Sequence, residues 1–195
     1  MSLSRATRFL ATAGVAALLP LAFASQAQAA VYIGNFALYN VSTGKCADLP
    51  GYGWNQPDSP VNQYGCALGT GDNQMWDVIE TRLVNGLHLF KFVNSKSQYC
   101  LDLPGYGAAP TSSRLSVYTC APDPETDNQE WYLVPVTGDG GNEIVNYKNG
   151  LCLDVWGLAA DGSDRADDLP LTVYPCYNSS WGGGGYDDHI WRFVN

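Results

Sequence analysis

The stretch NVSTGKCAD, residues 40–48, recurs as NSKSQYCLD at residues 94–102 and as NYKNGLCLD at residues 146–154. Each copy begins with asparagine, carries cysteine six positions later and ends on aspartate two positions after that cysteine. A period of about fifty residues lies in the range where internal repeats determine the architecture. The sequence therefore predicts one object built from three similar units.

Two further landmarks follow each copy in the same order. A second cysteine stands two positions after a tyrosine, and each unit closes on a tripeptide that ends in tryptophan. The Tyr-x-Cys triplets occupy residues 64–66, 118–120 and 174–176, and the closing tripeptides occupy residues 74–76, 129–131 and 189–191. Because the landmarks keep their order three times, we place the units at about residues 31–82, 83–136 and 137–195.

The first 29 residues differ from the repeats. Arg5 and Arg8 precede an apolar run at residues 9–24, and Ala-Gln-Ala at residues 27–29 offers the small side chains that a signal peptidase needs. This pattern is typical of a secretory signal peptide, and the alternative is an N-terminal membrane anchor. The apolar run is short for a membrane span. We therefore expect residues 1–29 to be removed, leaving residues 30–195 as a single secreted, extracellular domain without membrane insertion.

The charge of the chain disfavours two classes of partner. The formal net charge is -9, and the predicted signal peptide carries two arginines and no acids, so the remaining chain carries -11. A surface this acidic repels phosphate backbones and anionic lipid head groups before contact forms. We expect no nucleic acid partner and no membrane-surface role, whereas a neutral ligand meets no such repulsion.

All six cysteines follow the predicted signal peptide. An even cysteine count in a secreted chain indicates disulfides rather than metal or redox chemistry. Six cysteines allow 15 pairings, and the repeats make pairing within each unit the simplest. The expected disulfides are Cys46 with Cys66, Cys100 with Cys120, and Cys152 with Cys176. We expect no metal and no cofactor, because the cysteines are not closely spaced and His88 and His189 are the only histidines.

Short alternating apolar runs bounded by glycine, proline, asparagine and serine recur at matching places in the units. This pattern predicts an all-β chain with about four strands in each unit. One unit is too small to bury its apolar face, so the three should share one core inside a closed barrel with a capped end. We expect Trp76, Trp131 and Trp191 in that core. The buried amides of Gln74 and Gln129 should satisfy backbone groups.

At these landmarks the chain resembles the ricin-type β-trefoil lectin family, which is also met as family 13 carbohydrate-binding modules. The similarity rests on the Cys-x-Asp, Tyr-x-Cys and Gln-x-Trp motifs and spans the chain after the signal peptide. It implies a β-trefoil in which each unit has a shallow sugar pocket. In such pockets the aspartate accepts hydrogen bonds from sugar hydroxyls, the tyrosine stacks on the sugar, and an asparagine before the closing glutamine adds a contact.

The resemblance implies a set of carbohydrate-binding residues in each unit. These residues are Asp48, Asn62, Tyr64 and Asn73 in unit one, Asp102, Tyr118 and Asn128 in unit two, and Asp154, Tyr174 and Asp188 in unit three. Unit three departs from the pattern, because Asp188 and His189 stand where asparagine and glutamine are expected. A second carboxylate beside Asp154 would weaken an array of acceptors unless a cation or a basic ligand joins it.

The residue types suit a sugar, which has hydroxyl donors around its ring and an apolar face. An ionised carboxylate accepts stronger hydrogen bonds than a neutral group, and tyrosine offers a flat surface with little rotamer entropy to lose. The alternative is that the aspartates only cap the turns that follow them. Four aromatic residues lie just beyond the aspartates and form either a sugar platform or a packing layer: Tyr52, Trp54, Tyr106 and Trp156.

Unit three also contains an acidic insertion at residues 159–168 and a glycine run at residues 182–185. Clustered carboxylates suit a calcium ion, but no EF-hand spacing occurs. Between a calcium loop and a solvated loop we favour the solvated loop. The glycine run reads as a flexible tip.

The sequence contains no recognisable catalytic motif. We therefore expect a non-enzymatic lectin that recognises neutral sugars of polysaccharides or cell-surface glycans through up to three pockets, with a monomer favoured. One alternative is a β-trefoil that binds protein through its loops, as an inhibitor or toxin partner does. A second alternative is a small secreted hydrolase.

Overall fold

The computed structural model describes residues 29–138, 140–157, 160–176 and 188–195. Residues 1–28 of the predicted signal peptide and the glycine run at 182–185 lie outside these ranges. The described residues form a 13-stranded antiparallel sheet and one short 3-10 helix, η1 (Pro124–Thr126). Among them, no helix has the length and apolar character to cross a bilayer. The prediction of an all-β chain is confirmed.

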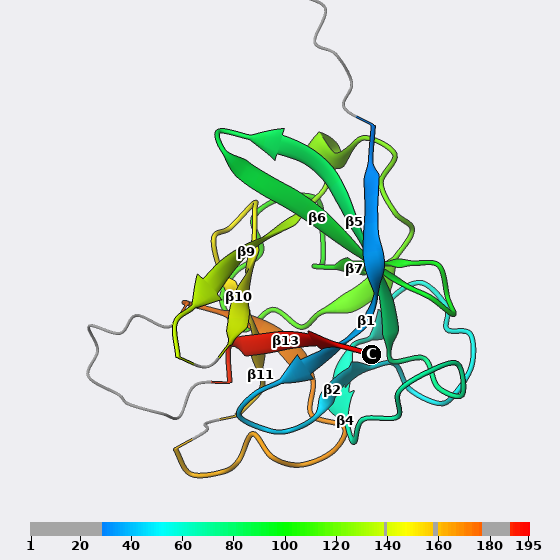
Figure 1. Cartoon of the computed structure of the whole chain (residues 1–195), viewed down its shortest axis with the longest axis vertical. Coiled ribbons are helices and arrows are strands. Elements are labelled where there is room, and N and C mark those ends of the chain that lie inside the picture. Colours follow the sequence, from blue (N-terminus) through cyan, green and yellow to red (C-terminus); the bar gives the residue numbers. More distant parts are fainter. Residues whose placement is uncertain (1–28, 139, 158–159, 177–187) are drawn as a thin grey trace, which may run out of the picture.

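Six strands close into a barrel, and each of them pairs with a neighbour on both sides. In order around the barrel they are β1 (Val31–Asn40), β5 (Met75–Val84), β6 (Leu87–Asn94), β9 (Trp131–Val136), β10 (Gly141–Asn146) and β13 (Ile190–Val194). Figure 1 shows the C-terminal strand β13, in red, beside the blue strand β1, and the two pair with Leu38 opposite Phe193. The first and last strands thus join the three units into one object.

A hairpin from each unit caps one end of the barrel. These hairpins are β2 (Cys46–Asp48) with β4 (Asn62–Tyr64), β7 (Cys100–Asp102) with β8 (Ser116–Tyr118), and β11 (Cys152–Val155) with β12 (Leu171–Tyr174). The short strand β3 (Ser59–Pro60) pairs with β8 of the next unit, and bridges join Asn62 to Pro170 and Arg114 to Thr172. A six-stranded barrel capped by three hairpins is the predicted β-trefoil.

The three closing tryptophans lie in one shared core. Trp76, Trp131 and Trp191 are fully buried, on β5, β9 and β13. Each stands opposite an asparagine that opens one of the repeated stretches, namely Asn94, Asn146 and Asn40 respectively. These asparagines are fully buried, and each Nδ2 donates to the backbone carbonyl of the residue three positions before a closing tryptophan. The asparagine landmark therefore joins each unit to its neighbour.

The three predicted disulfides are all present. Cys46 bonds to Cys66, Cys100 to Cys120, and Cys152 to Cys176, and no cysteine is free. In each unit the bond joins the first strand of the capping hairpin to the residue two positions after the tyrosine of the second strand. The disulfides thus hold the hairpins that carry the aspartates and tyrosines of the repeats.

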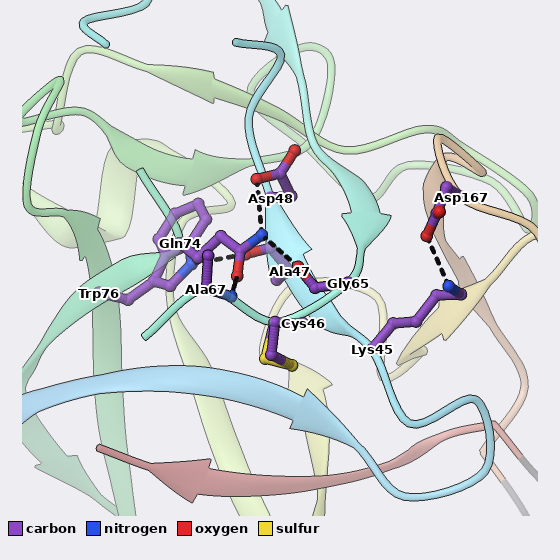
Figure 2. Close-up of a disulfide and its surroundings, with 10 residues drawn as sticks. Lys45, Cys46, Ala47, Asp48, Gly65, Ala67, Gln74, Trp76 and Asp167 are labelled. Carbon is purple, nitrogen blue, oxygen red and sulfur yellow. Dashed lines mark hydrogen bonds and ion pairs between the residues drawn. A yellow bond between two sulfur atoms is a disulfide. The ribbon is translucent and has the colours of Figure 1, made fainter. Parts of the chain in front are cut away.

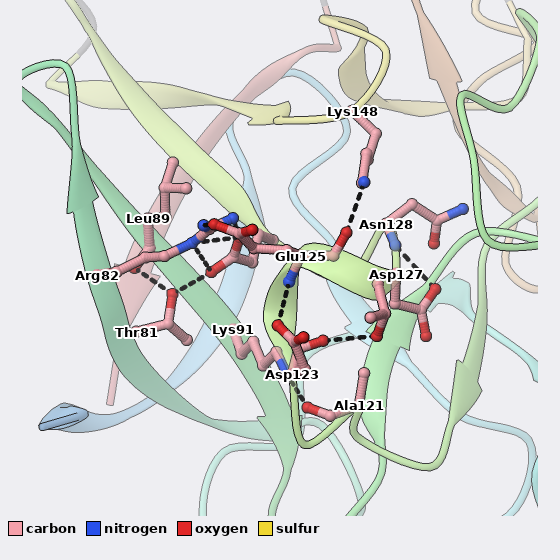
Figure 3. A network of polar contacts seen from close by, with 12 residues as sticks. Thr81, Arg82, Leu89, Lys91, Ala121, Asp123, Glu125, Asp127, Asn128 and Lys148 are labelled. Carbon is pink, nitrogen blue, oxygen red and sulfur yellow. Dashed lines mark hydrogen bonds and ion pairs between the residues drawn. The ribbon is translucent and has the colours of Figure 1, made fainter. Parts of the chain in front are cut away.

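Unit two departs from threefold symmetry at the middle residue of its closing tripeptide. This residue is Glu130, where the other units have Met75 and Ile190, and its side chain is 2% exposed. Arg82 compensates the charge with Nη2 2.6 Å from Oε2, and it also pairs with Glu125 of η1 (Figure 3). Because removal of Arg82 would leave the buried charge of Glu130 unpaired, this ion pair fastens β5 to the residue directly before β9.

Candidate functional site

The capping hairpin of unit one forms one wall of a hollow with a volume of about 270 Å³. Asp48 and Tyr64 come from the two strands of that hairpin, where Asp48 stands opposite Asn62 and Tyr64 opposite Cys46. The residues that line the hollow are Asp48, Pro50, Gly51, Tyr52, Tyr64, Asp72 and Asp168. The structure thus brings together the aspartate and the tyrosine that the sequence singled out in unit one, and it adds two further carboxylates.

The side chain of Gln74 fixes the orientation of Asp48. Gln74 Nε2 donates to Asp48 Oδ1 at 3.1 Å and to the carbonyl of Gly65 at 3.1 Å, and Oε1 accepts from the backbone N–H of Ala67 at 2.7 Å (Figure 2). Gln74 is fully buried, so its amide has no competing contact with solvent. Among the described residues none donates a hydrogen bond to Asp48 Oδ2, so this oxygen remains available as an acceptor.

Unit two repeats this arrangement. Gln129 Nε2 donates to Asp102 Oδ1 at 2.9 Å and to the carbonyl of Thr119 at 3.0 Å, and Oε1 accepts from the N–H of Ala121 at 2.9 Å. The hollow beside it has a volume of about 250 Å³, and its lining residues are Asp58, Asp102, Pro104, Gly105, Tyr106, Tyr118 and Asp127. Units one and two therefore present two copies of one site.

Burial shifts the titration of both aspartates. Asp48 and Asp102 are each 6% exposed, and desolvation of the carboxylate raises the pKa of each to about 7. The hydrogen bond from the glutamine opposes this shift, whereas the charges of Asp72 at Asp48 and of Asp127 at Asp102 add to it. Both carboxyl groups thus change charge near neutral pH.

Each of these hollows receives a carboxylate from a neighbouring unit. Asp168 of unit three lines the hollow of unit one, and Asp58 of unit one lines that of unit two. Both have left-handed backbones, with φ of 62° and 65°, and both donate their N–H to a carbonyl of the next hairpin. Ser112 of unit two has the same φ of 65° and donates its N–H to Val173 in unit three.

Asp58 and Asp168 were not among the site residues predicted from the sequence. A signal for them exists, because each begins an Asp-x-Pro-apolar stretch, at residues 58–61 and 168–171. The sequence signal can be interpreted only once the three units are placed in a ring, because each aspartate lines the hollow of a different unit from its own.

The predicted asparagines take a different place from the direct sugar contact that the resemblance implies. Asn73 and Asn128 are fully buried and do not line the hollows. Asn73 Nδ2 donates to the carbonyls of Gly51 and Gly53 at 2.9 and 3.2 Å, and Asn128 Nδ2 bonds to Gly105 and Gly107 in the same way. The amides thus brace the turns after Asp48 and Asp102.

The residues that precede these asparagines line the hollows instead. The carboxylates of Asp72 and Asp127 each accept the N–H of the next residue at 2.8 Å, as Figure 3 shows for Asp127. Asn62 is not among the lining residues of the first hollow, although it stands opposite Asp48 in the hairpin.

Four exposed tyrosines lie in the two hollows. Tyr52 and Tyr106 are 75% and 73% exposed, and they share the hollows with Tyr64 and Tyr118, which are 40% and 37% exposed. Exposure of this degree identifies Tyr52 and Tyr106 as surface residues rather than a packing layer. Trp54 is also exposed, with its ring 6.1 Å from that of Tyr99. Each hollow thus offers two aromatic side chains beside its aspartate.

Unit three has a different arrangement around its aspartate. Thr172 Oγ1 donates to Asp154 Oδ2 at 2.6 Å, and His189 occupies the position of Gln74, with Nε2 3.3 Å from Asp154 Oδ1. Asp188 Oδ1 lies 3.8 Å from His189 Nδ1, so both carboxylates lie next to the imidazole. Tyr174 is 46% exposed, and its ring centroid lies 6.3 Å from that of His189.

Trp156 and the acidic insertion complete unit three. The Trp156 ring is 47% exposed, and the guanidinium carbon of Arg114 lies 5.9 Å from its centroid. In the described part of the insertion, from residue 160, most residues are exposed, as predicted for a solvated loop, and Asp164 is the buried exception. The insertion packs on unit one, because Gln63 Nε2 donates to the carbonyls of Asp164 and Ala166 at 2.5 and 2.8 Å.

The four aspartates of this insertion have different environments. Asp164 is fully buried, Asp167 pairs with Lys45 at 2.5 Å (Figure 2), Asp168 lines the first hollow, and Asp161 accepts the N–H of Ser163. The acidic residues therefore do not converge on one point, which is what a calcium loop would require.

Several solved structures share this fold. The designed threefold-symmetric protein ThreeFoil is 24% identical, with a TM-score of 0.61, and the match covers 83% of this chain and 98% of that one. A ricin B-like lectin from Macrolepiota procera, solved in complex with lactose, is 15% identical, with a TM-score of 0.58 and coverage of 88% and 97%. No curated protein matches the chain in sequence.

The fold also occurs as part of an enzyme. An exo-beta-1,3-galactanase from Clostridium thermocellum is 21% identical, with a TM-score of 0.60, and the match covers 82% of this chain and 30% of that one. The model of the family described as ricin-type beta-trefoil lectin domain-like matches residues 26–118 and 72–166. Together with the three hairpins that cap the barrel and the repeated motifs, this match shows that the chain belongs to the ricin-type β-trefoil lectin domain family.

Proposed function

We propose that this protein is a secreted, non-catalytic lectin that binds neutral sugars of polysaccharides or cell-surface glycans through its shallow hollows. The observation that carries the proposal is the pair of matching sites in units one and two. In each, a glutamine holds one oxygen of an aspartate while the other oxygen faces no donor from the described chain. Two tyrosines share that hollow with the aspartate.

This combination matches the two chemical features of a sugar ring. The oriented carboxylate accepts hydrogen bonds from hydroxyl groups, and charge makes these bonds stronger than those to a neutral acceptor. The tyrosine faces contact the C–H surface of the ring at little cost in rotamer entropy. The three carboxylates of each hollow repel anions, which favours a neutral sugar over a sulfated or phosphorylated one.

The hollows are shallow, so one site should bind weakly. Two sites on one rigid barrel gain affinity when both engage the same polysaccharide, because the second binding event is intramolecular. We assign the principal binding to units one and two, with Asp48, Tyr64, Asp102 and Tyr118 as contact residues. Asn73 and Asn128 support the site by holding the turns. In unit three we propose Asp154 and Tyr174 as a weaker third contact.

Non-catalytic binding and secretion are parts of the proposal that rest on different observations. The acids of units one and two occur as two equivalent sets in open hollows, whereas hydrolysis requires one acid pair on either side of a shielded bond. Three disulfides and the signal-like pattern at residues 1–29 support export to an oxidising compartment. The sites of units one and two act as binding surfaces, and the proposed sugar binding there involves no cofactor.

The test is retention of the protein on immobilised galactan, xylan and glucan, each with and without competing monosaccharide. Asp48→Ala with Asp102→Ala should abolish retention on the polysaccharide that holds the unaltered protein. Tyr64→Phe with Tyr118→Phe is the matched control, because it keeps the aromatic faces and should preserve most of the retention. Unfolding curves of each variant would show that the fold persists.

Two outcomes would count against the proposal. Retention of the aspartate double variant at the original level would refute the assigned sites. Binding to a protein partner that free sugar never displaces would favour the alternative of a protein-interaction β-trefoil. Release of free sugar from the polysaccharide by the pure protein would instead revive the hydrolase alternative.

A further inference from the structure

Unit three differs from the other two units at two adjacent positions that meet the same aspartate. Asn73-Gln74 and Asn128-Gln129 correspond to Asp188-His189. The replacement keeps the contact geometry, since His189 Nε2 lies 3.3 Å from Asp154 Oδ1, compared with 3.1 and 2.9 Å from glutamine Nε2 to aspartate in units one and two. It changes the chemistry, because a neutral imidazole offers a nitrogen lone pair and an amide nitrogen does not.

The three side chains form a compact group of metal-ligating atoms. One ligand atom from each of Asp154, Asp188 and His189 lies within 4.8 Å of the other two. The residues are 8%, 5% and 8% exposed, so the group is not a set of surface acids. For a tetrahedral zinc ion, bond lengths of about 2.0 to 2.2 Å to nitrogen and oxygen place two ligands roughly 3.4 Å apart. The separation of 3.3 Å between His189 Nε2 and Asp154 Oδ1 matches this spacing. Asp188 Oδ1 lies 3.8 Å from the other ring nitrogen, Nδ1, so the side chain of Asp188 or His189 would have to turn for all three residues to bind one ion.

A neighbouring hydroxyl orients the group. Thr172 Oγ1 donates to Asp154 Oδ2 at 2.6 Å, which leaves Oδ1 on the side of the histidine. Partners that hold a ligating carboxylate in this way are typical of metal sites. In unit two the residue at this position of the hairpin is Ser116, opposite Asp102, and in unit one it is Asn62, opposite Asp48.

The charges of the group also suit a divalent cation. Asp154 and Asp188 contribute two negative charges when both are ionised. A divalent ion balances both, and neutral imidazole keeps that balance. The mixed nitrogen and oxygen set suits zinc or a similar transition metal, whereas calcium prefers six to eight oxygen ligands.

We propose that Asp154, Asp188 and His189 form a binding site for a divalent transition metal such as zinc, with a further coordination position left for water or a ligand hydroxyl. The site goes beyond the proposed sugar binding of units one and two, because those units have amides in the equivalent positions. A second group of ligand types, Glu143 with Cys152 and Cys176, does not compete, because its sulfur atoms form a disulfide.

Equilibrium dialysis of the intact disulfide-bonded protein against zinc tests the proposal. We expect one zinc ion per chain. Asp188→Asn with His189→Gln gives unit three the Asn-Gln pair that units one and two already accommodate, and it should weaken zinc binding by at least about tenfold. His88→Gln is the matched control, because His88 is the only other histidine and lies on the surface beside Glu80. This variant should bind zinc as the unaltered protein does.

Cobalt(II) provides a second measurement, because its visible absorption is intense in a four-coordinate site and weak in water. The cobalt spectrum should appear with the unaltered protein and with His88→Gln, and disappear with His189→Gln alone, which covers the case in which the double variant fails to fold. Absence of stoichiometric zinc, or equal zinc binding by the His189 variants, or its loss in His88→Gln, would overturn the proposal. Retention on polysaccharide through units one and two is measured without added metal. A failure of the metal proposal can therefore be distinguished from a failure of the sugar-binding proposal.

Discussion

Lowering the pH from 8 to 5 should release the protein from its polysaccharide while the fold becomes more stable. The pKa of Asp48 and of Asp102 is raised to about 7, principally by desolvation. Sugar hydroxyls donate to the ionised carboxylate, so the protonated form is the weaker acceptor. At pH 8 about 90% of each carboxyl group is ionised, and at pH 5 about 1%.

The ionised fraction sets the size of the effect. Because the apparent dissociation constant scales with the inverse of the competent fraction, it should rise by up to about 100-fold at each site between pH 8 and pH 5. The stability changes in the opposite direction. A carboxyl group whose pKa is raised in the folded state binds its proton more readily there than in the unfolded chain, so the free energy of unfolding increases as the pH falls toward 4.

Retention on the polysaccharide column and urea unfolding, each measured at every half unit of pH, provide the assay. Asp72→Asn with Asp127→Asn is the matched variant, because the amide oxygen can still accept the N–H of the next residue while the neighbouring charge is removed. The midpoint for release should therefore move to lower pH. Retention that is constant from pH 8 to 5, a midpoint that moves upward in the variant, or release that parallels unfolding would refute the reasoning.

Three further predictions concern stability. Trp191→Ala should lower the free energy of unfolding by about 3 to 5 kcal/mol in urea titrations, because the fully buried indole leaves a cavity in the shared core; a loss below 1 kcal/mol would contradict its placement. Cys100→Ser with Cys120→Ser should cost roughly 3 kcal/mol, as expected for a 20-residue loop, and an unchanged unfolding midpoint would contradict the estimate. Asn73→Ala should weaken retention on polysaccharide through unit one and lower the thermal midpoint, because the turn after Asp48 loses its brace; protection of the turn amides in hydrogen exchange, unchanged from the unaltered protein, would argue against this.

Most of the architecture could be predicted from the repeated motifs, because their spacing is local and periodic in the sequence. The pairing of Cys46 with Cys66 follows from a repeat that places both cysteines in one unit. The burial of Trp76 follows from its place in an apolar strand segment. Neither inference needs to know how one unit sits against another.

The sequence was less informative about side-chain direction. Asn73 and Asp72 are neighbours on the chain and both suit a sugar, yet Asn73 faces the turn at Gly51 while Asp72 lines the hollow. Asp72 and Asn73 lie in a bend before β5, where no regular alternation fixes the side-chain directions, so a motif identifies the pair without stating which member reaches the ligand.

By itself the sequence determined an all-β chain of three units, their disulfides and the aspartate and tyrosine of each candidate site, because covalent spacing and apolar periodicity encode these features directly. Only the tertiary structure decided that β13 closes the barrel against β1, that Asp168 reaches the hollow of unit one, and that Asp154, Asp188 and His189 converge. The physical reason is that these contacts join residues far apart in the chain, whose meeting depends on packing around the common core rather than on any local preference.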